Sequence, residues 1–297
     1  MAEGYLRYPH VHDDQVVFVA DDDLWLVNKQ GGRASRLTSD RTKVRDPWIS
    51  PDGARVAYAS TAGGNFDAYV LDLESGERRR ITWLADRALE VVGWRDAETV
   101  LVATAHAQMD RSRQRIWAVG LDGKMTLLDL GLAESYAKIG DVEAITVPNF
   151  RHKEYWKRYR GGTASKIWLR CAGQWSRILP EITADCHPIG ASGERFFFSS
   201  DHDASLAENP DGQAQLYSVD IHGEDLRRHT DFGVDRGYVR DPKSDGQQIV
   251  FHARGRLYYL ADLDAEATEI EIELPGVSVD KIMVDASNHL EHICPDK

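Results

Sequence analysis

The chain has 297 residues, a hydrophobic content of 42% and a net charge of −12, with an isoelectric point near 5.4. This acidic balance argues against general binding to nucleic acid or to an anionic membrane surface. Residues 1–7 lack an apolar signal core, and no run approaches the roughly 18 apolar residues of a membrane span. The three cysteines, Cys171, Cys186 and Cys294, have no CxxC spacing. These features favour a cytoplasmic protein with reduced thiols, and we expect neither a nucleic-acid nor a membrane partner.

The first four predicted strands cover residues 6–12, 16–20, 24–27 and 35–38. Each is a short run of apolar or alternating residues, which is typical of β-strands and too short for a helix. The next unit, residues 44–82, repeats this order. It contains the turn Pro51-Asp52-Gly53, in which proline presets φ and glycine tolerates positive φ.

The third strand of each unit carries a central aromatic residue, and these aromatics are Trp25, Tyr69, Trp117, Trp168, Tyr217 and Tyr258. The steps between them are 44, 48, 51, 49 and 41 residues. A four-stranded unit of roughly 40–50 residues is typical of a β-propeller blade. The sequence therefore predicts an all-β, six-bladed propeller of antiparallel blades over residues 1–275. We expect the recurring aromatics to pack in the core.

The later blades follow in order. Blade three is predicted over residues 91–128 and blade four over 136–179, with a long basic connection at 148–165. Blade five begins with an inner strand at 186–189 and has a long acidic connection at 201–213. Blade six repeats the Val-Arg-Asp-Pro of blade two at residues 239–242, and its outer strand is predicted at 270–274.

Two expectations concern the ends of the chain. Blade one supplies its own inner strand and blade six its own outer strand, so the ring is predicted to close without strand exchange, by side-chain packing alone. Residues 290–297 are similar to the inner strand and turn at 48–53. We therefore expect residues 276–297 to be a tail that begins a missing following domain, since a lone inner strand cannot bury its faces.

Some segments go beyond generic propeller patterns. Residues 155–169, together with Gly4–Pro9, Val16–Phe18 and Asp23–Val27, resemble the N-terminal six-bladed propeller of the tricorn protease family. The resemblance implies a ring that is normally followed by a seven-bladed propeller, a PDZ-like domain and catalytic domains using serine and histidine. Those parts are absent from this sequence, so no catalytic residue is carried over.

The same resemblance implies a function. The family's full enzyme is a cytosolic, self-assembling serine peptidase that trims peptides, and its six-bladed ring is thought to line a passage to or from the active chamber. The expected function is therefore that of a non-catalytic domain that guides peptides. The expected partners are peptides, the missing C-terminal domains and, as an alternative to a monomer, further copies of the protein.

The residues themselves offer little chemistry. No GxSxG elbow is present, and Gly190–Gly193 is predicted to be a turn. Ser/His/Asp sets meet only in space and stay open as an alternative, a channel-centred enzyme. His10, His12 and His187 lie on predicted inner strands and could face the channel as metal ligands. We expect hydrogen-bonded histidines instead, with no metal and no cofactor.

Two basic clusters stand out, one with Arg111 and Arg113 and the other with Lys157, Arg158 and Arg160. Both lie in second-to-third-strand connections, of blades three and four, so they are predicted to form a basic rim around one opening. Guanidinium groups bind carboxylates in a bidentate manner. The hypothesis is that Arg111 and Arg113 bind the C-terminal carboxylate of peptides, as the tricorn resemblance implies for a basic pair. The alternative is solvated loop charges, or salt bridges to a missing domain.

A further alternative for the whole chain is a stand-alone TolB-like propeller that binds a protein or peptide partner. Trp48 and Trp94, at or just after inner strands, are expected to be structural.

Overall fold

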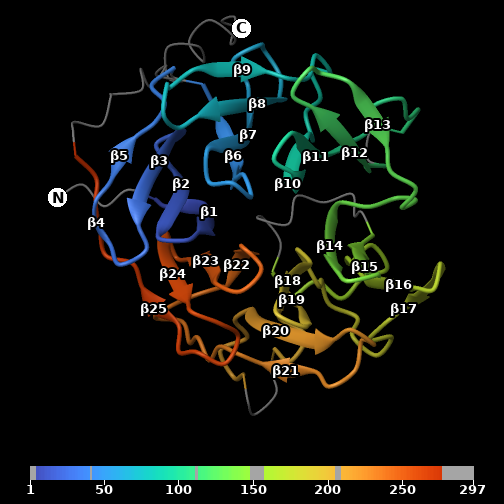
Figure 1. Ribbon diagram of the computed structural model, residues 1–297. Coiled ribbons are helices and arrows are strands. Elements are labelled where there is room, and N and C mark those ends of the chain that lie inside the picture. Colours follow the sequence, from blue (N-terminus) through green and yellow to red (C-terminus); the bar gives the residue numbers. More distant parts are fainter. Residues whose placement is uncertain (1–4, 41, 111–112, 148–156, 205–208, 276–297) are drawn as a thin grey trace, which may run out of the picture.

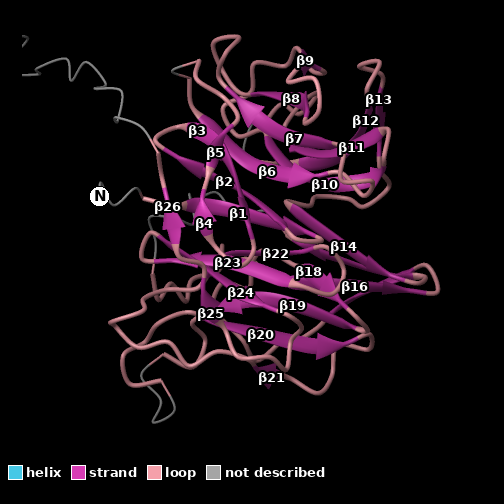
Figure 2. Cartoon of the chain, turned by 60° about the vertical axis from the view of Figure 1, so that its left-hand side comes forward, coloured by secondary structure: helices cyan, strands magenta, loops and turns pink. Residues whose placement is uncertain are grey.

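The structure of the protein is a computed structural model, and it describes residues 5–40, 42–110, 113–147, 157–204 and 209–275. Within these residues the regular secondary structure is entirely β, and six four-stranded sheets form a ring (Figure 1). Figure 2 shows the strands of these blades from the side. The prediction of a six-bladed all-β propeller is confirmed.

The strand bounds are as follows. Blade one contains β1 (Arg7–His12), β2 (Gln15–Ala20), β3 (Asp23–Asn28) and β5 (Ser35–Arg36), and blade two contains β6 (Val44–Ile49), β7 (Arg55–Ser60), β8 (Asp67–Asp72) and β9 (Arg78–Arg80). Blade three contains β10 (Glu90–Asp96), β11 (Thr99–Thr104), β12 (Arg115–Gly120) and β13 (Met125–Leu127), and blade four contains β14 (Ser135–Ile139), β15 (Val142–Thr146), β16 (Ile167–Cys171) and β17 (Gln174–Arg177). Blade five contains β18 (Gly190–Ser192), β19 (Arg195–Ser200), β20 (Gln215–Asp220) and β21 (Arg227–Arg228), and blade six contains β22 (Arg240–Ser244), β23 (Ile249–Ala253), β24 (Arg256–Leu260) and β25 (Thr268–Glu269).

In every blade the strands pair antiparallel in chain order, and the first strand faces the centre of the ring (Figure 1). The core consists of six clusters of buried apolar side chains. Each cluster contains one of the six recurring aromatics, as the sequence predicts. These aromatics are therefore core residues of the blades, and the side chains that remain for binding lie on the inner strands and the connections.

Short polar latches tie the outer strand to the third strand. In blade two the Thr82 hydroxyl donates to Asp67 Oδ1 at 2.8 Å and accepts from the Ala68 amide at 2.9 Å. Arg80 donates to the other Asp67 oxygen at 2.6 Å. Equivalent latches join Asp23 with Thr38 and Gln215 with Thr230. Because these groups are buried, the mutual hydrogen bonds offset the cost of removing them from water.

Ring closure differs from the prediction. Each blade does build its four strands from one continuous segment, but the ends also meet through hydrogen bonds. Strand β26 (Ile272–Glu273) pairs in parallel with β4 (Gly32–Arg33) of blade one. The Gly32 amide donates to Glu271 O at 2.8 Å, and the Ala34 amide donates to Glu273 O at 2.9 Å. The expectation of closure by side-chain packing alone is therefore wrong.

The predicted outer strand of blade six at 270–274 is also wrong in its position, because β25 ends at Glu269. The backbone that follows pairs with blade one instead, where exposed β4 offers unpaired backbone groups. The tail at 276–297 lies outside the described residues, and its assignment to a following domain stays a prediction.

Three inner strands share a bulge at an Arg-X-Pro sequence. The register slips within Arg7–His10, Arg45–Trp48 and Arg240–Lys243. The residue before each proline has a positive φ, between 48° and 53°. Proline has no amide hydrogen for the ladder, so the bulge places it where no donor is needed. The residue after each proline is thereby turned at the ring centre, which positions His10, Trp48 and Lys243.

The inner strand of blade five is displaced from the prediction. It is β18 at Gly190–Ser192, where a turn was predicted, and residues 186–189 precede it. Pro188 cannot donate to a ladder, and this explains why regular pairing starts only after it.

Candidate functional site: the central channel

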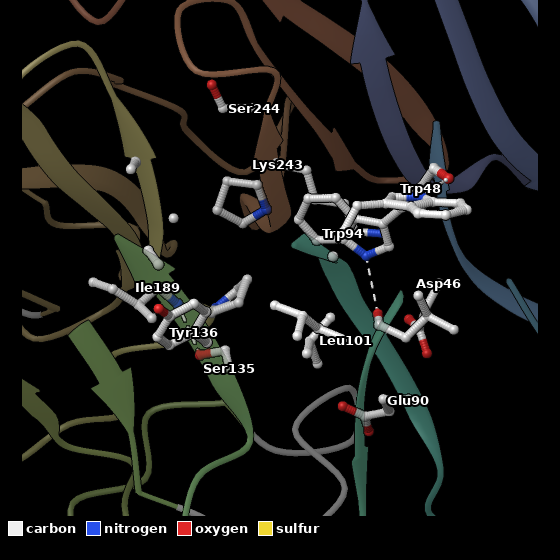
Figure 3. Close-up of a pocket in the computed structure, with 18 of the residues that line it drawn as sticks. Asp46, Trp48, Glu90, Trp94, Leu101, Ser135, Tyr136, Ile189, Lys243 and Ser244 are labelled. Atoms are coloured by element: carbon white, nitrogen blue, oxygen red, sulfur yellow. Dashed lines mark hydrogen bonds between the residues drawn. The ribbon is translucent and has the colours of Figure 1, made fainter. Parts of the chain in front are cut away.

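A cavity of about 370 Å³ lies on the ring axis, between the inner strands β6, β10, β14, β18 and β22 (Figure 3). Its apolar lining includes Trp48, Trp94, Leu101, Pro188 and Ile189. A concave site with apolar walls and a few polar groups is typical of ligand binding. The volume is enough for one or two amino-acid side chains.

Two indoles form a fixed wall of this cavity. Trp48 donates from Nε1 to Val91 O, and Trp94 donates from Nε1 to Trp48 O, each at 2.9 Å (Figure 3). The ring of His10 packs on Trp48, with the centroids 4.6 Å apart. The tryptophans therefore join neighbouring inner strands, which agrees with the structural role expected from the sequence. They also line the cavity, and the sequence did not reveal this second role.

Lys243 is a buried cation at the cavity. Its ammonium donates to Pro47 O at 3.0 Å and lies 4.8 Å from the centroid of the Trp48 ring. Burial lowers the pKa of Lys243 to about 8, although nearby carboxylates, Asp46 first among them, oppose the change. The group is thus held in place by a carbonyl and an aromatic face, both of which favour the charged form.

Two carboxylates line the same region of the cavity. Asp46 Oδ2 is buried and lacks a hydrogen-bond donor among the described residues, with Arg45 Nε 3.5 Å away. Burial raises the pKa of Asp46 to about 7; Arg45 opposes this rise and Glu90 adds to it. Glu90 makes no side-chain hydrogen bond or ion pair with the part of the chain that the structure describes. This corner of the cavity therefore holds the carboxyl group of Asp46, which keeps its proton up to about pH 7, beside Glu90, which has no direct partner among the described residues.

A third carboxylate, Asp241, is compensated. Burial alone would raise its pKa, but His252 donates from Nε2 to Asp241 Oδ2 at 2.8 Å, and Lys243 and Arg240 lie nearby. Together they hold the pKa of Asp241 well below its usual range. Asp241 is thus an ionised partner of His252.

Two of the three histidines considered as metal ligands, His10 and His187, have other partners. His10 Nδ1 accepts from the Ile49 amide at 3.1 Å, and burial lowers the pKa of His10. His187 Nδ1 lies 3.2 Å from Thr146 Oγ1 and 3.5 Å from Glu134 Oε1. Among the described residues, no three His, Cys, Asp or Glu side chains gather in a way that could hold a metal ion.

Of the arginine pair in the carboxylate hypothesis, the structure describes only Arg113. Arg111 is outside the described residues. Arg113 is exposed and donates from Nε to Asp110 Oδ2 at 3.2 Å. It is not among the residues that line the cavity.

The structure joins the second basic cluster to the acidic connection of blade five. Asp201 accepts from the Arg158 amide at 2.6 Å and from Arg160 Nη1 at 2.7 Å. Arg158 also donates from Nη2 to Asp211 O at 2.7 Å. Two of the three predicted rim cations are thus bound within the ring. The opposite charges of the two long connections were the sequence signal for this contact.

Lys157 is exposed, as are Arg158 and Arg160, and its described contact is with an aromatic ring. Its ammonium lies 4.5 Å from the centroid of the Tyr238 ring, and Arg240 lies over the same ring at 5.2 Å. Burial lowers the pKa of Lys157, and the charges of Arg240 and Arg158 lower it further.

Two further features concern the cysteines and the search for membrane-spanning helices. Cys171 is exposed and Cys186 is buried, both as free thiols; burial raises the pKa of Cys186 to about 12, and Cys294 lies outside the described residues. In the described part of the chain, no helix has the length and apolar character needed to cross a membrane.

The fold and its axial cavity define a six-bladed propeller of the kind in which inner strands surround a central channel. The chain belongs to the family described as the tricorn protease N-terminal β-propeller domain, whose model matches residues 3–266.

Two tricorn proteins support this assignment. The chain is 37% identical over 283 residues to tricorn protease homolog 1 of Streptomyces coelicolor, covering 94% of the chain and 26% of that protein. The crystal structure of the tricorn protease superposes with a TM-score of 0.82 at 28% identity, covering 93% of this chain and 27% of that one. The chain thus spans about a quarter of the length of these relatives.

TolB from Acinetobacter baumannii superposes with a TM-score of 0.58 at 15% identity, over 91% of this chain and 66% of that one. At this level of identity the likeness concerns the fold alone.

Proposed function

We propose that this chain is the non-catalytic propeller domain of a tricorn-type serine peptidase and that it guides peptides to or from an active chamber. Its partners are peptides, the C-terminal domains that the longer relatives contain, and further copies of the protein in the assembled peptidase. Cytoplasmic peptide degradation is the setting, and neither nucleic acid nor a membrane is a partner.

The observation that carries this proposal is the cavity on the ring axis. It is enclosed by the inner strands of five blades and lined by Trp48 and Trp94. Peptides offer apolar side chains, which the indoles can contact, and charged termini, which the titratable lining groups can bind. The family membership supports peptides as the ligand class.

The basic residues of the two clusters extend the proposal to the mouth of the channel. Arg111 and Arg113 bind the C-terminal carboxylate of a peptide, and Lys157 contributes to a basic rim. Arg158 and Arg160 act indirectly, since their contacts with Asp201 fix the connection that carries Lys157.

The experiment is to block the cavity and measure peptide binding. Ser244 lines the cavity, so a Ser244→Cys variant can carry a bulky maleimide there, in a background with Cys171 and Cys294 replaced by serine. Fluorescence anisotropy then follows binding of a labelled nonapeptide to the purified chain. A matched control carries the same adduct at exposed Ser35 on β5.

The proposal predicts that the Ser244 adduct abolishes most of the binding, that the Ser35 adduct leaves it unchanged, and that the chain alone does not cleave the peptide. Equal binding by both adducts, or cleavage by the chain alone, would overturn it.

A further inference from the structure

The charged groups of the cavity are not balanced. Of its cations, Lys243 is bound to Pro47 O, Arg95 pairs with Asp96 at 3.1 Å, and Lys138 is exposed to solvent. Of its five carboxylates, Asp241 is bound to His252 at 2.8 Å, Glu134 accepts from the Ser165 hydroxyl, and Asp245 accepts from Gln248 Nε2 at 2.7 Å. Asp46 has only the Arg45 Nε contact at 3.5 Å, and Glu90 makes no side-chain hydrogen bond or ion pair among the described residues.

Of these two carboxylates, Glu90 has the fewer direct partners. It is partly buried at the start of β10, and its side chain makes no hydrogen bond or ion pair in the part of the chain described by the structure. Figure 3 shows Glu90 and Asp46 on the same side of the cavity, below the indoles of Trp48 and Trp94. The guanidinium of Arg45 is shared: its Nε lies 3.5 Å from Asp46 Oδ2, its Nη2 donates to Leu89 O at 2.7 Å, and the group lies over the Phe66 ring at 4.1 Å.

The indoles complete the surroundings. The ring of Trp48 is in contact with both His10 and Lys243. Trp94 also lines the cavity, and its ring has no aromatic or cationic partner among the described residues. An aromatic ring that lines a cavity beside carboxylates favours a ligand cation carried on an apolar stem, because the ring and the carboxylates attract the charge while the walls bury the stem.

From this geometry we infer that the cavity is a subsite for a cationic group of a peptide, bound by Glu90 and Asp46 against the face of Trp94. The inference rests on the proposed function and names the peptide class that the channel prefers. The cation is either an arginine or lysine side chain or the free amino terminus. The titration of Asp46 is consistent with this, because a bound cation favours the ionised carboxylate.

The test compares three short peptides by isothermal titration calorimetry with the 297-residue chain. The first is acetyl-Ala-Arg-Ala-amide, the second replaces arginine by neutral citrulline, and the third is the citrulline peptide with a free amino terminus. Citrulline keeps the size of arginine and removes its charge, so the pair isolates the cation. The indole N–H signals of Trp48 and Trp94 in ¹⁵N spectra report whether the peptide is in the cavity.

Glu90→Gln removes the carboxylate without changing its size. Glu266→Gln is the matched control, since Glu266 is exposed on blade six and does not line the cavity. Asp46→Asn is a second variant, because asparagine tolerates the positive φ at this position.

We expect the arginine peptide to bind at least tenfold more tightly than its capped citrulline counterpart, with shifts of both indole signals. Glu90→Gln should remove most of this preference, and Glu266→Gln should retain it. Tight binding of the third peptide, the citrulline peptide with a free amino terminus, would identify the amino terminus as a second source of the cation.

Equal binding of the arginine and capped citrulline peptides, or an unchanged preference in Glu90→Gln, overturns the inference and leaves peptide binding by the channel intact. If none of the peptides binds, and the nonapeptide does not bind either, the proposed function fails as well.

Discussion

The buried ammonium of Lys243, on the inner strand of blade six, donates to the carbonyl oxygen of Pro47 in blade two at 3.0 Å. Blade one lies between these two blades, so the bond joins strands that are not neighbours in the ring (Figure 1). Both residues belong to the Arg-X-Pro bulges, which turn Lys243 and Trp48 toward the axis. The chemistry of the channel therefore depends on a backbone irregularity shared by distant parts of the chain.

The first prediction concerns Asp46 and pH. The pKa of Asp46 is raised from 3.8 to about 7, so the folded state retains a proton that the unfolded state loses. The unfolded state then binds fewer protons between about pH 4 and pH 7, and stability falls as pH rises through this range. The neighbouring charges are Arg45, Glu90, Lys243 and Asp241.

Asp46→Asn should remove this loss. Urea unfolding at pH 4, 5.5 and 7.5 should show the variant gaining stability over the parent as pH rises, by about 1–4 kcal/mol in total. A difference in free energy of unfolding that stays constant across these pH values would contradict the assigned pKa.

The second prediction concerns the carboxylate hypothesis. Replacing both Arg111 and Arg113 by alanine should weaken binding of peptides with a free C-terminal carboxylate about tenfold, because charge-assisted hydrogen bonds are lost. Amidated peptides should bind unchanged. A control that replaces Arg79 and Lys124, both exposed, removes the same charge elsewhere. Unchanged affinity in the double variant, measured by anisotropy, would refute the hypothesis.

The third prediction concerns Asp201, a buried carboxylate shared by three blades. It accepts from the Arg158 amide, from Arg160, and from the Tyr238 hydroxyl at 2.5 Å. Asp201→Ala leaves these donors without a partner and should cost about 3 kcal/mol or more. Thermal and urea unfolding measure this, and Asp141→Ala, at an exposed position, should change stability by less than about 0.5 kcal/mol. Similar losses of unfolding free energy in both variants would show that the contacts of Asp201 stabilise the fold no more than an exposed carboxylate does.

The fourth prediction concerns ring closure. Gly31 has φ +92°, and a Cβ there would collide with Glu271 O, in the segment that pairs with blade one. Gly76 has φ +72° and open space around its Cβ position. Gly31→Ala should therefore lose about 1–3 kcal/mol more than Gly76→Ala, which has the strain of positive φ alone.

Hydrogen exchange distinguishes a local effect from a global one. The Ala34 amide, which donates to Glu273 O at 2.9 Å, should exchange faster in Gly31→Ala than in Gly76→Ala. Equal stability and equal exchange in the two variants would show that the β4–β26 pairing does not close the ring.

Much of the fold could be predicted because each blade repeats the third-strand aromatic, and because blades two and six share an Asp-Gly turn after the inner strand. The closure was missed because β26 is two residues long and its partner, β4, is more than 200 residues away. Neither the length of such a strand nor its pairing has a periodic signature.

The candidate site was harder to predict. Opposite charges marked the two long connections, yet the contacts of Asp201 with Arg158 and Arg160 depend on three-dimensional proximity. The repeated Arg-Asp-Pro of blades two and six marked the inner strands that carry Asp46 and Lys243. The bulge decides which side chains of these strands point into the channel, because a one-residue slip in register changes the face to which a side chain points.

The central claim, that peptides occupy the channel, is tested most directly by photo-crosslinking. A peptide that carries benzoylphenylalanine is irradiated with the chain, and mass spectrometry locates the adducts. We predict adducts on the inner strands around Trp94 and Lys243, suppressed by unlabelled peptide and by the Ser244 adduct. Adducts confined to the outer strands β9, β13 and β21, or insensitive to competitor, would contradict the account.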